Sequence, residues 1–221
     1  MGSRFGGRAW LPDGCPPRCA ACDAPMPLLL QLDLGEAPGD LGRGLLQAFY
    51  CADPDCEQKC DGWVPFSRIH RVRIVAGTGA LDETRNTDYP ARSIVSWAAL
   101  DDMPSAEDHE VLGLEATYDF KANTVSIRCP SVGLNAGAIP IDDLPVEEIA
   151  DAASGDKLLG WPHWVQGPEY AQCPRCRNLM RYLFQIESRK NLPIMWGDLG
   201  VAHIFQCVSH PDVLTMAWAC S

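Results

Sequence analysis

Short apolar runs, separated by stretches rich in glycine and proline, follow one another along the chain and predict β-strands. Residues 28–33 and 44–51 are apolar runs of strand length joined by a glycine-rich turn, the pattern of an antiparallel hairpin. Residues 71–75 and 124–128 alternate polar with apolar side chains, as half-exposed strands do. The pattern predicts a mainly β or α+β protein.

The other predicted elements are two helices, a loop and one more strand. Residues 104–111 are acidic and are headed by the capping residue Ser105, and residues 144–152 carry acids near their start, so both segments predict helices. Residues 76–90 are rich in Gly, Thr, Asp and Asn, which predicts a long loop. The apolar run at 93–100 predicts a further strand.

One segment of the chain occurs twice, since residues 6–33 match residues 160–187 at a shift of 154 positions. Each copy has a stretch with glycine and tryptophan, a Cys-x-x-Cys motif and an apolar strand centred on a glutamine. Two copies with so long a period indicate a duplicated domain, because stacked repeats have periods of about 20–50 residues. The matched pairs are Gly6 and Gly160, Trp10 and Trp164, Cys19 and Cys173, Cys22 and Cys176, and Gln31 and Gln185.

The duplication predicts two zinc-knuckle β lobes, at residues 1–75 and 158–221, joined by an acidic region with strands and short helices at residues 76–157. A chain of 221 residues is long enough to bury a substantial core. We expect the lobes to pack against each other about a pseudo-twofold axis.

Four candidate metal ligands gather in the first half of the chain. Cys19 and Cys22 form one pair, and Cys51 and Cys56 form another at the end of the second predicted strand. Cys60 is an alternative to Cys56, although the shorter step from Cys51 favours Cys56. Zinc prefers four tetrahedral sulfur or imidazole ligands, and a two-residue spacer lets both thiolates reach one ion.

The second half repeats this arrangement with one histidine. Cys173 and Cys176 form the first pair, and Cys207 and His210 supply a Cys-x-x-His at the end of the equivalent strand. Each half therefore predicts one structural zinc ion, two in all. A Cys-x-x-Cys can instead cycle between dithiol and disulfide when a helix N-terminus lowers a thiol pKa, but here each motif precedes a predicted strand.

The remaining cysteines and the tryptophans have simpler interpretations. Cys129 and Cys220 have no partner by spacing, so we expect them to pack as small apolar residues. The tryptophans near each knuckle either form an aromatic peptide-binding surface or pack over the metal sites, and the second alternative is the commoner one. They are Trp10, Trp63, Trp161, Trp164 and Trp218.

Charge and targeting signals limit the function. The formal net charge is −11, which provides no electrostatic footprint for nucleic acid or for an anionic membrane and favours a basic protein partner. No run of apolar residues is long enough to span a membrane, and the first residues lack the order of a signal peptide. With eleven cysteines in such a chain, we expect a cytoplasmic protein that binds metal.

The sequence contains no motif of a known enzyme class. It has no Gly-x-Ser-x-Gly, no His-Glu-x-x-His and no Walker-type phosphate loop, and Gly77-Thr78-Gly79 lacks the third glycine of a dinucleotide-binding turn. We therefore predict a non-catalytic, protein-binding module. A thiol- or metal-dependent enzyme, suggested by the number of cysteines alone, is an alternative.

The two ends of the chain resemble known families. The Gly-Gly, Trp, Cys-x-x-Cys and Leu-Leu-Gln motifs near the N-terminus are similar to those of the programmed cell death protein 2 family, and the C-terminal copy is similar to that family and to bacterial YwqG-like proteins. The stretch 157–162 resembles the Lys-Leu-Gly-Gly-x-Pro motif of YwqG-like proteins, with Leu159 in place of the first glycine. The resemblance extends only loosely to residues 76–145.

The first resemblance implies a chaperone that binds a basic small-subunit ribosomal protein. The second implies no established activity, although some YwqG-like proteins look like immunity proteins encoded beside toxins. A toxin-immunity function is therefore a further alternative. What the resemblance transfers to this chain is limited to the knuckle cysteines.

Overall fold

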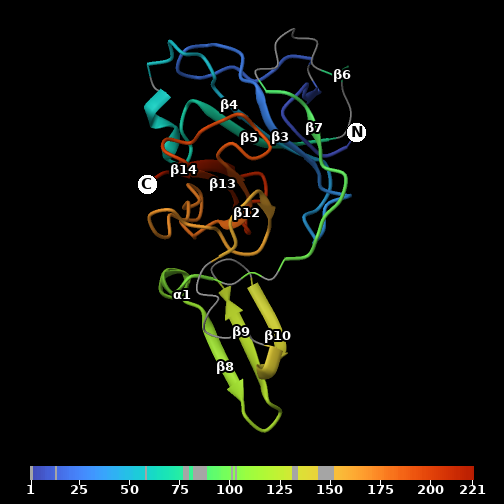
Figure 1. The fold of residues 1–221 in the computed structure, drawn as a ribbon, viewed down its shortest axis with the longest axis vertical. Helices are drawn as coiled ribbons and strands as arrows, with labels where there is room; N and C mark the ends of the chain where they lie inside the picture. The colour runs from blue at the N-terminus through green and yellow to red at the C-terminus, as the bar shows by residue number, and fades with distance from the viewer. Residues whose placement is uncertain are drawn as a thin grey trace.

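Two β-sheets with matching strand order form the body of the protein in the computed structural model (Figure 1). The first sheet has the order β5-β4-β3-β1-β7 and the second has the order β11-β12-β13-β14. The structure describes residues 2–12, 14–57, 59–76, 80–81, 89–100, 102, 104–130, 134–143 and 152–221.

All strand pairs in these two sheets are antiparallel. The strands of the first sheet are β1 (Arg4–Phe5), β3 (Leu28–Asp33), β4 (Leu45–Tyr50), β5 (His70–Val75) and β7 (Arg92–Ser93). The strands of the second sheet are β11 (Lys157–Leu158), β12 (Arg181–Glu187), β13 (Val201–Gln206) and β14 (Leu214–Ala219). The hairpin predicted at residues 28–51 and the strand predicted at 71–75 are confirmed, as is the mainly β fold.

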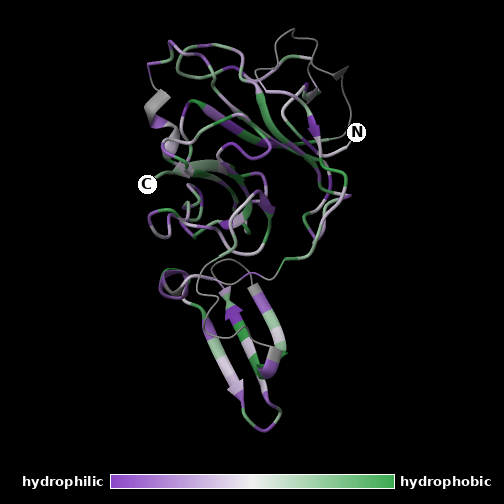
Figure 2. Ribbon diagram, viewed as in Figure 1, coloured by the Kyte–Doolittle hydropathy of each residue, from purple (hydrophilic) through white to green (hydrophobic). Residues whose placement is uncertain are grey.

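A third sheet projects from the body at one end of the long axis (Figure 1). It has the order β10-β9-β8, and α1 lies at its base. Hydrophilic and hydrophobic residues alternate along its central strand, at residues 124–129 (Figure 2), so the two kinds of side chain point to opposite faces of that strand. Its elements are α1 (Ala106–Leu112), β8 (Glu115–Asp119), β9 (Thr124–Cys129) and β10 (Leu134–Pro140).

The described residues also contain four short elements. β2 (Trp10–Leu11) pairs with β6 (Ala80–Leu81) in a separate two-stranded sheet. Two 3-10 helices, η1 (Lys59–Trp63) and η3 (Ile141–Asp143), follow β4 and β10. No helix within the described ranges is long and apolar enough to cross a membrane.

The two large sheets share their hydrogen-bond register, so the lobes are copies of one unit. The pair β3–β4 has a bulge between Leu28 and Leu30, and the pair β12–β13 has a bulge between Tyr182 and Phe184. These positions are related by the predicted shift, since 182 − 28 = 154. An irregularity that recurs at equivalent positions supports an internal duplication.

Ahead of the Cys-x-x-Cys motifs the predicted pairing of glycines is wrong by one residue. Gly6 N donates to Leu29 O, and Leu159 N donates to Leu183 O, both at 2.8 Å. Leu159, and not Gly160, is therefore the counterpart of Gly6, at a shift of 159 − 6 = 153. Both residues have a left-handed backbone, with φ of 57° and 58°, which costs a leucine more than a glycine.

The same correction applies to the tryptophans. Trp10 N donates to Gln31 Oε1 at 3.0 Å, and His163 N donates to Gln185 Oε1 at 2.9 Å. His163 is therefore the counterpart of Trp10, and Trp164 is not. One extra residue between the turn and the knuckle of the second copy explains the displacement, since 19 − 6 = 13 in the first copy and 173 − 159 = 14 in the second.

Both lobes contribute to one hydrophobic core. Phe5, Leu30 and Phe49 of the first lobe belong to the same buried cluster as Phe184 and Trp196 of the second. The rings of Phe5 and Phe184 are 5.9 Å apart, so the contact between lobes starts at their equivalent first strand pairs. Burial of this shared apolar area stabilises the pairing of the lobes.

The region between the lobes departs most from the predictions. The strand predicted at 93–100 is wrong beyond Ser93, since residues 94–100 have no regular secondary structure. β8 and β10 were not predicted, whereas the strand at 124–128 and the capped helix after Ser105 are confirmed. The predicted helix at 144–152 falls outside the described residues except for Ala152, as does most of the predicted loop at 76–90. The division at 75 and 157 stays a prediction.

Candidate metal centres

The first Cys-x-x-Cys motif folds into a tight turn between two antiparallel segments. Cys19 N donates to Ala24 O at 2.8 Å, and Asp23 N donates to Cys19 O at 2.9 Å. Asp23 has a left-handed backbone with φ of 61°, and its carboxylate forms an exposed ion pair with Arg18 at 2.8 Å. This turn directs both thiols of the knuckle to one side.

The second pair of thiols in this half comes from the end of β4. Cys51 follows β4 directly, and Cys56 lies five positions further on in the following loop. The Sγ atoms of Cys22 and Cys51 are 3.6 Å apart, and those of Cys19 and Cys56 are 4.0 Å apart. All four Sγ atoms lie within 4.8 Å of one another. The structure therefore brings together the four cysteines predicted from the spacing.

The second lobe repeats the knuckle in detail. Cys173 N donates to Asn178 O at 2.9 Å and Arg177 N donates to Cys173 O at 2.8 Å, which matches the bonds of the first knuckle at a shift of 173 − 19 = 154. Arg177 is left-handed like Asp23, with φ of 65°. The backbone path of the knuckle is conserved between the copies although the side chains around it differ.

A histidine completes the second cluster. The Sγ atoms of Cys176 and Cys207 are 3.6 Å apart. Nδ1 of His210 lies 3.7 Å from Sγ of Cys173 and 3.6 Å from Sγ of Cys207. These four ligand atoms also lie within 4.8 Å of one another, so the predicted set of Cys173, Cys176, Cys207 and His210 is brought together.

Both clusters have the dimensions of a four-coordinate metal site. Tetrahedral bonds of about 2.3 Å to sulfur place two sulfurs about 3.8 Å apart, and an imidazole nitrogen at about 2.0–2.1 Å lies slightly closer to them. The observed separations of 3.6–4.0 Å bracket these values. Each cluster could therefore hold one metal ion with four protein donors.

Backbone N–H groups around each knuckle favour thiolates. Burial alone raises the pKa of Cys173, but N–H donation from Cys176 and Arg175 to its sulfur outweighs burial and lowers the pKa to about 6. In the first knuckle burial is likewise outweighed by N–H donation from Cys22 and Ala21, which lowers the pKa of Cys19. A lowered pKa supports metal binding, because the thiolate is the metal ligand.

The pKa of one partner thiol in each cluster, Cys51 or Cys207, shifts in the opposite direction, upwards. Burial and the neighbouring Cys173 sulfur raise the pKa of Cys207 to about 11, and burial raises the pKa of Cys51. Several thiolates packed around one point repel each other, so one sulfur takes the negative charge first. A cation at the centre of each cluster removes this conflict, which is an electrostatic reason for a metal ion there.

The other cysteines lie outside these clusters. Cys129 is fully buried and Cys220 is half-buried, which agrees with packing roles, and Cys15 is exposed. The side chain of Cys60 falls outside the described residues, so the predicted exchange of Cys60 for Cys56 stays open. The geometry nevertheless provides a complete set with Cys56.

Most of the tryptophans follow the packing alternative. Trp10 is buried, and Trp164 packs against the cluster that contains Cys173 and Cys207. Trp164 also makes an edge contact with Tyr170 at 4.9 Å. Trp63, which is 53% exposed, is the exception.

Two buried aspartates that the sequence analysis assigned to no site tie the connecting region to the second lobe. Asp108 is fully buried and accepts hydrogen bonds from Trp164 Nε1 at 2.7 Å and Tyr170 Oη at 2.9 Å. Asp102 forms an ion pair with Lys157 at 2.8 Å in which both side chains are 9% exposed. No spacing signal pointed to these contacts, because each aspartate lies more than fifty positions from its partners.

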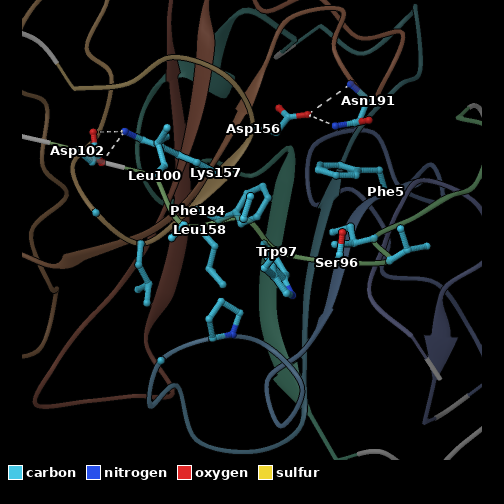
Figure 3. A pocket seen from close by; sticks show the side chains of 18 of the residues that line it. Phe5, Ser96, Trp97, Leu100, Asp102, Asp156, Lys157, Leu158, Phe184 and Asn191 are labelled. Atoms are coloured by element: carbon cyan, nitrogen blue, oxygen red, sulfur yellow. Dashed lines mark hydrogen bonds and ion pairs between the residues drawn. The ribbon is translucent and has the colours of Figure 1, made fainter.

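A cavity of about 650 Å³ lies between the two lobes, away from both metal clusters (Figure 3). Phe5 of β1 and Leu158 of β11 line it, and these are equivalent positions in the first strands of the two copies. One wall is the segment 93–100. The Asp102–Lys157 ion pair and the hydrogen bonds between Asp156 and Asn191 lie at its edge (Figure 3).

Fold and site together define a mainly β protein of two duplicated lobes, each with a Cys-rich cluster of metal-site geometry. The chain belongs to the family defined by a domain of unknown function, DUF1963, whose model matches residues 3–213. No curated protein matches the chain significantly. The match covers the first lobe, the region between the lobes, and the second lobe up to the start of β14.

Proposed function

We propose that this protein is a zinc-stabilised, non-catalytic module that binds a basic protein. The observation that carries the proposal is that each cluster supplies all four donors of a four-coordinate metal ion. Each cluster offers four protein donors at tetrahedral spacing, whereas a catalytic zinc keeps one position open for water or substrate. Such a site contributes to folding and leaves binding to other surfaces.

Zinc is the metal that these donors favour. Four thiolates, or three thiolates and one imidazole, are the usual ligand sets of structural zinc. The neutral imidazole of His210 would bind through Nδ1, the atom that faces Cys173 and Cys207. Free thiols of this kind persist in a reducing compartment, which supports a cytoplasmic location.

The charge of the chain supports a basic partner. A net charge of −11 repels nucleic acid and acidic proteins and attracts basic ones over a distance set by the salt concentration. A ribosomal-type protein, as expected from the resemblance to the programmed cell death protein 2 family, is the specific partner class that we propose. A chaperone for such a protein would shield its charge before assembly.

Binding to purified ribosomal proteins tests this proposal. The panel contains basic small-subunit proteins and, as a control, acidic proteins of similar size, and affinity is measured by biolayer interferometry at increasing salt. We expect binding to basic proteins that weakens as salt increases, because screening shortens the range of the attraction. Absence of binding to any basic protein at low salt would reject the proposed function.

A further inference from the structure

We propose that the groove between residues 94–100 and the β11 edge holds an extended segment of the basic partner, bound as an added β-strand with apolar side chains in the cavity. This inference rests on the proposed function and assigns it a site. Extended peptides bind exposed strand edges through main-chain hydrogen bonds, and adjacent pockets select their alternate side chains.

The wall formed by residues 94–100 is apolar and exposed, although its sequence, Ile-Val-Ser-Trp-Ala-Ala-Leu, is typical of a buried strand. Val95 is 90% exposed, Leu100 is 59% exposed and Trp97 is 37% exposed. Single exposed apolar residues are ordinary, but a continuous run beside a cavity is typical of an interaction site.

Within the described part of the chain, the backbone of this wall is unpaired beyond its first residue. Ile94 N donates to Ser3 O at 2.9 Å, and beyond it no hydrogen bond joins residues 95–100 to any other part of the described chain. The segment nevertheless lines the cavity continuously from Ser93 to Leu100. It therefore offers donors and acceptors in the form that an added strand needs.

The opposite wall is a strand edge. β11 is the first strand of the second sheet, with β12 on one side and no other described strand on the other. Leu158 of this edge, with Phe5 and Phe184, contributes to the apolar surface of the cavity (Figure 3), and the following residue, Leu159, also lines it. An extended chain placed here would meet apolar side chains below and unpaired backbone beside it.

The charges of the groove favour an uncharged central segment of the ligand, and the net charge of the chain favours basic residues on either side of that segment. Lys157 and Asp102 neutralise each other in a buried pair, so neither of these two groups offers a free charge to a ligand. Asp156 accepts from the backbone and side chain of Asn191, and the charged groups that line the cavity are two carboxylates and one ammonium. This local excess of negative charge has the sign of the whole chain, −11.

Fluorescence anisotropy with a synthetic peptide tests the groove directly. The probe is a labelled peptide in which valine alternates with threonine between paired lysines. One control peptide has N-methylated backbone amides, which cannot pair as a strand, and another has glutamates in place of the lysines. We expect the first peptide to bind and both controls to bind about tenfold or more weakly.

Variants locate the binding. Ala99→Trp fills the groove and Ala98→Pro removes one of its backbone N–H donors, and both alter exposed residues. Ala122→Trp, at an exposed position in the turn between β8 and β9, is the matched control. We expect the groove variants to lose about tenfold or more in peptide affinity, and the control variant to bind as the original chain does.

The outcomes separate this inference from the proposed function. If basic proteins bind the original chain and Ala99→Trp equally well, the assignment of the binding site to the groove is wrong, and the proposed binding function stands. If the peptide fails to bind the original chain, or binds equally well with glutamate flanks, the groove assignment is also wrong. A dimer in sedimentation that Ala99→Trp converts to monomers would mean that a second copy occupies the groove, which overturns the proposed occupant.

Discussion

Gln47 and His203 occupy equivalent positions in the two lobes and hold the equivalent backbone carbonyl. Gln47 Nε2 donates to Trp10 O at 2.6 Å, and His203 Nε2 lies 3.1 Å from His163 O. Because a carbonyl only accepts, His203 must donate from Nε2. The two copies thus anchor the segment that leads into the knuckle by equivalent hydrogen bonds from different side chains.

This substitution gives the second lobe a pH dependence. Burial lowers the pKa of His203 from its ordinary value to about 3, so the folded protein keeps this imidazole neutral. Protonation therefore favours unfolding, and stability present above about pH 6.5 is lost as the pH falls towards the folded pKa. The loss from this group should reach about 2 kcal/mol by pH 5.

His203→Gln should remove that loss. Glutamine is the residue at the equivalent position of the first lobe, where the amide of Gln47 donates to the equivalent carbonyl, that of Trp10. We expect the variant to lose less stability than the original chain between pH 6.5 and 5 in urea unfolding, by about 2 kcal/mol. His203→Asn, whose shorter side chain does not reach the carbonyl, should destabilise at both pH values. Equal pH dependence of the original chain and His203→Gln would contradict the assignment.

A second prediction decides between Cys56 and Cys60 as the fourth ligand of the first cluster. Cys56→Ser should reduce the bound metal from two ions to one, because the sulfur 4.0 Å from Cys19 Sγ is removed. Cys60→Ser should retain both ions. Elemental mass spectrometry of the two purified variants makes the comparison, and the reverse pattern would assign the site to Cys60.

The two clusters of candidate ligands could be predicted from sequence because each Cys-x-x-Cys knuckle is a local motif. Cys19 and Cys22 are three positions apart, and the duplication supplied independent support through Cys173 and Cys176. The second pairs follow at the ends of predictable apolar strands, so their approach to the knuckles follows from an antiparallel hairpin. Local spacing and strand pairing were therefore sufficient to predict which residues form the two clusters.

The polar contacts between distant segments could not be predicted in the same way. Asp102 reaches Lys157 and Asp108 reaches Trp164 across more than fifty positions, and an acidic residue in a polar stretch looks like a solvated one. The strand predicted at residues 93–100 is wrong at residues 94–100 for a related reason. Their composition favours a strand, but a strand needs a neighbour, and the described chain provides none beyond Ser93.

Metal removal should unfold the lobes. Structural zinc contributes about 10 kcal/mol or more of folding free energy, which is comparable with the whole stability of a typical domain, about 5–15 kcal/mol. We expect a strong chelator to remove both ions together with the β-sheet signal in circular dichroism. Added zinc should restore both signals. Loss of metal with an unchanged spectrum would show that the clusters are not structural.

The last prediction concerns the buried carboxylate that connects α1 to the second lobe. Asp108 accepts from Trp164 Nε1, Tyr170 Oη and Ser105 N, and it caps the helix at the same time. Asp108→Asn replaces one acceptor oxygen with a donor, so at least one of these buried donors loses its partner. We expect a loss of about 2–4 kcal/mol in urea unfolding.

Glu110→Gln is the matched control, since Glu110 is exposed on the same helix and forms no hydrogen bond or ion pair within the described chain. Its effect should stay within about 0.5 kcal/mol. Tryptophan fluorescence gives a second measurement, because the indole of Trp164 bonds directly to the Asp108 carboxylate. A changed emission in Asp108→Asn but not in Glu110→Gln would attribute the loss to this contact, whereas equal stability of the two variants would contradict it.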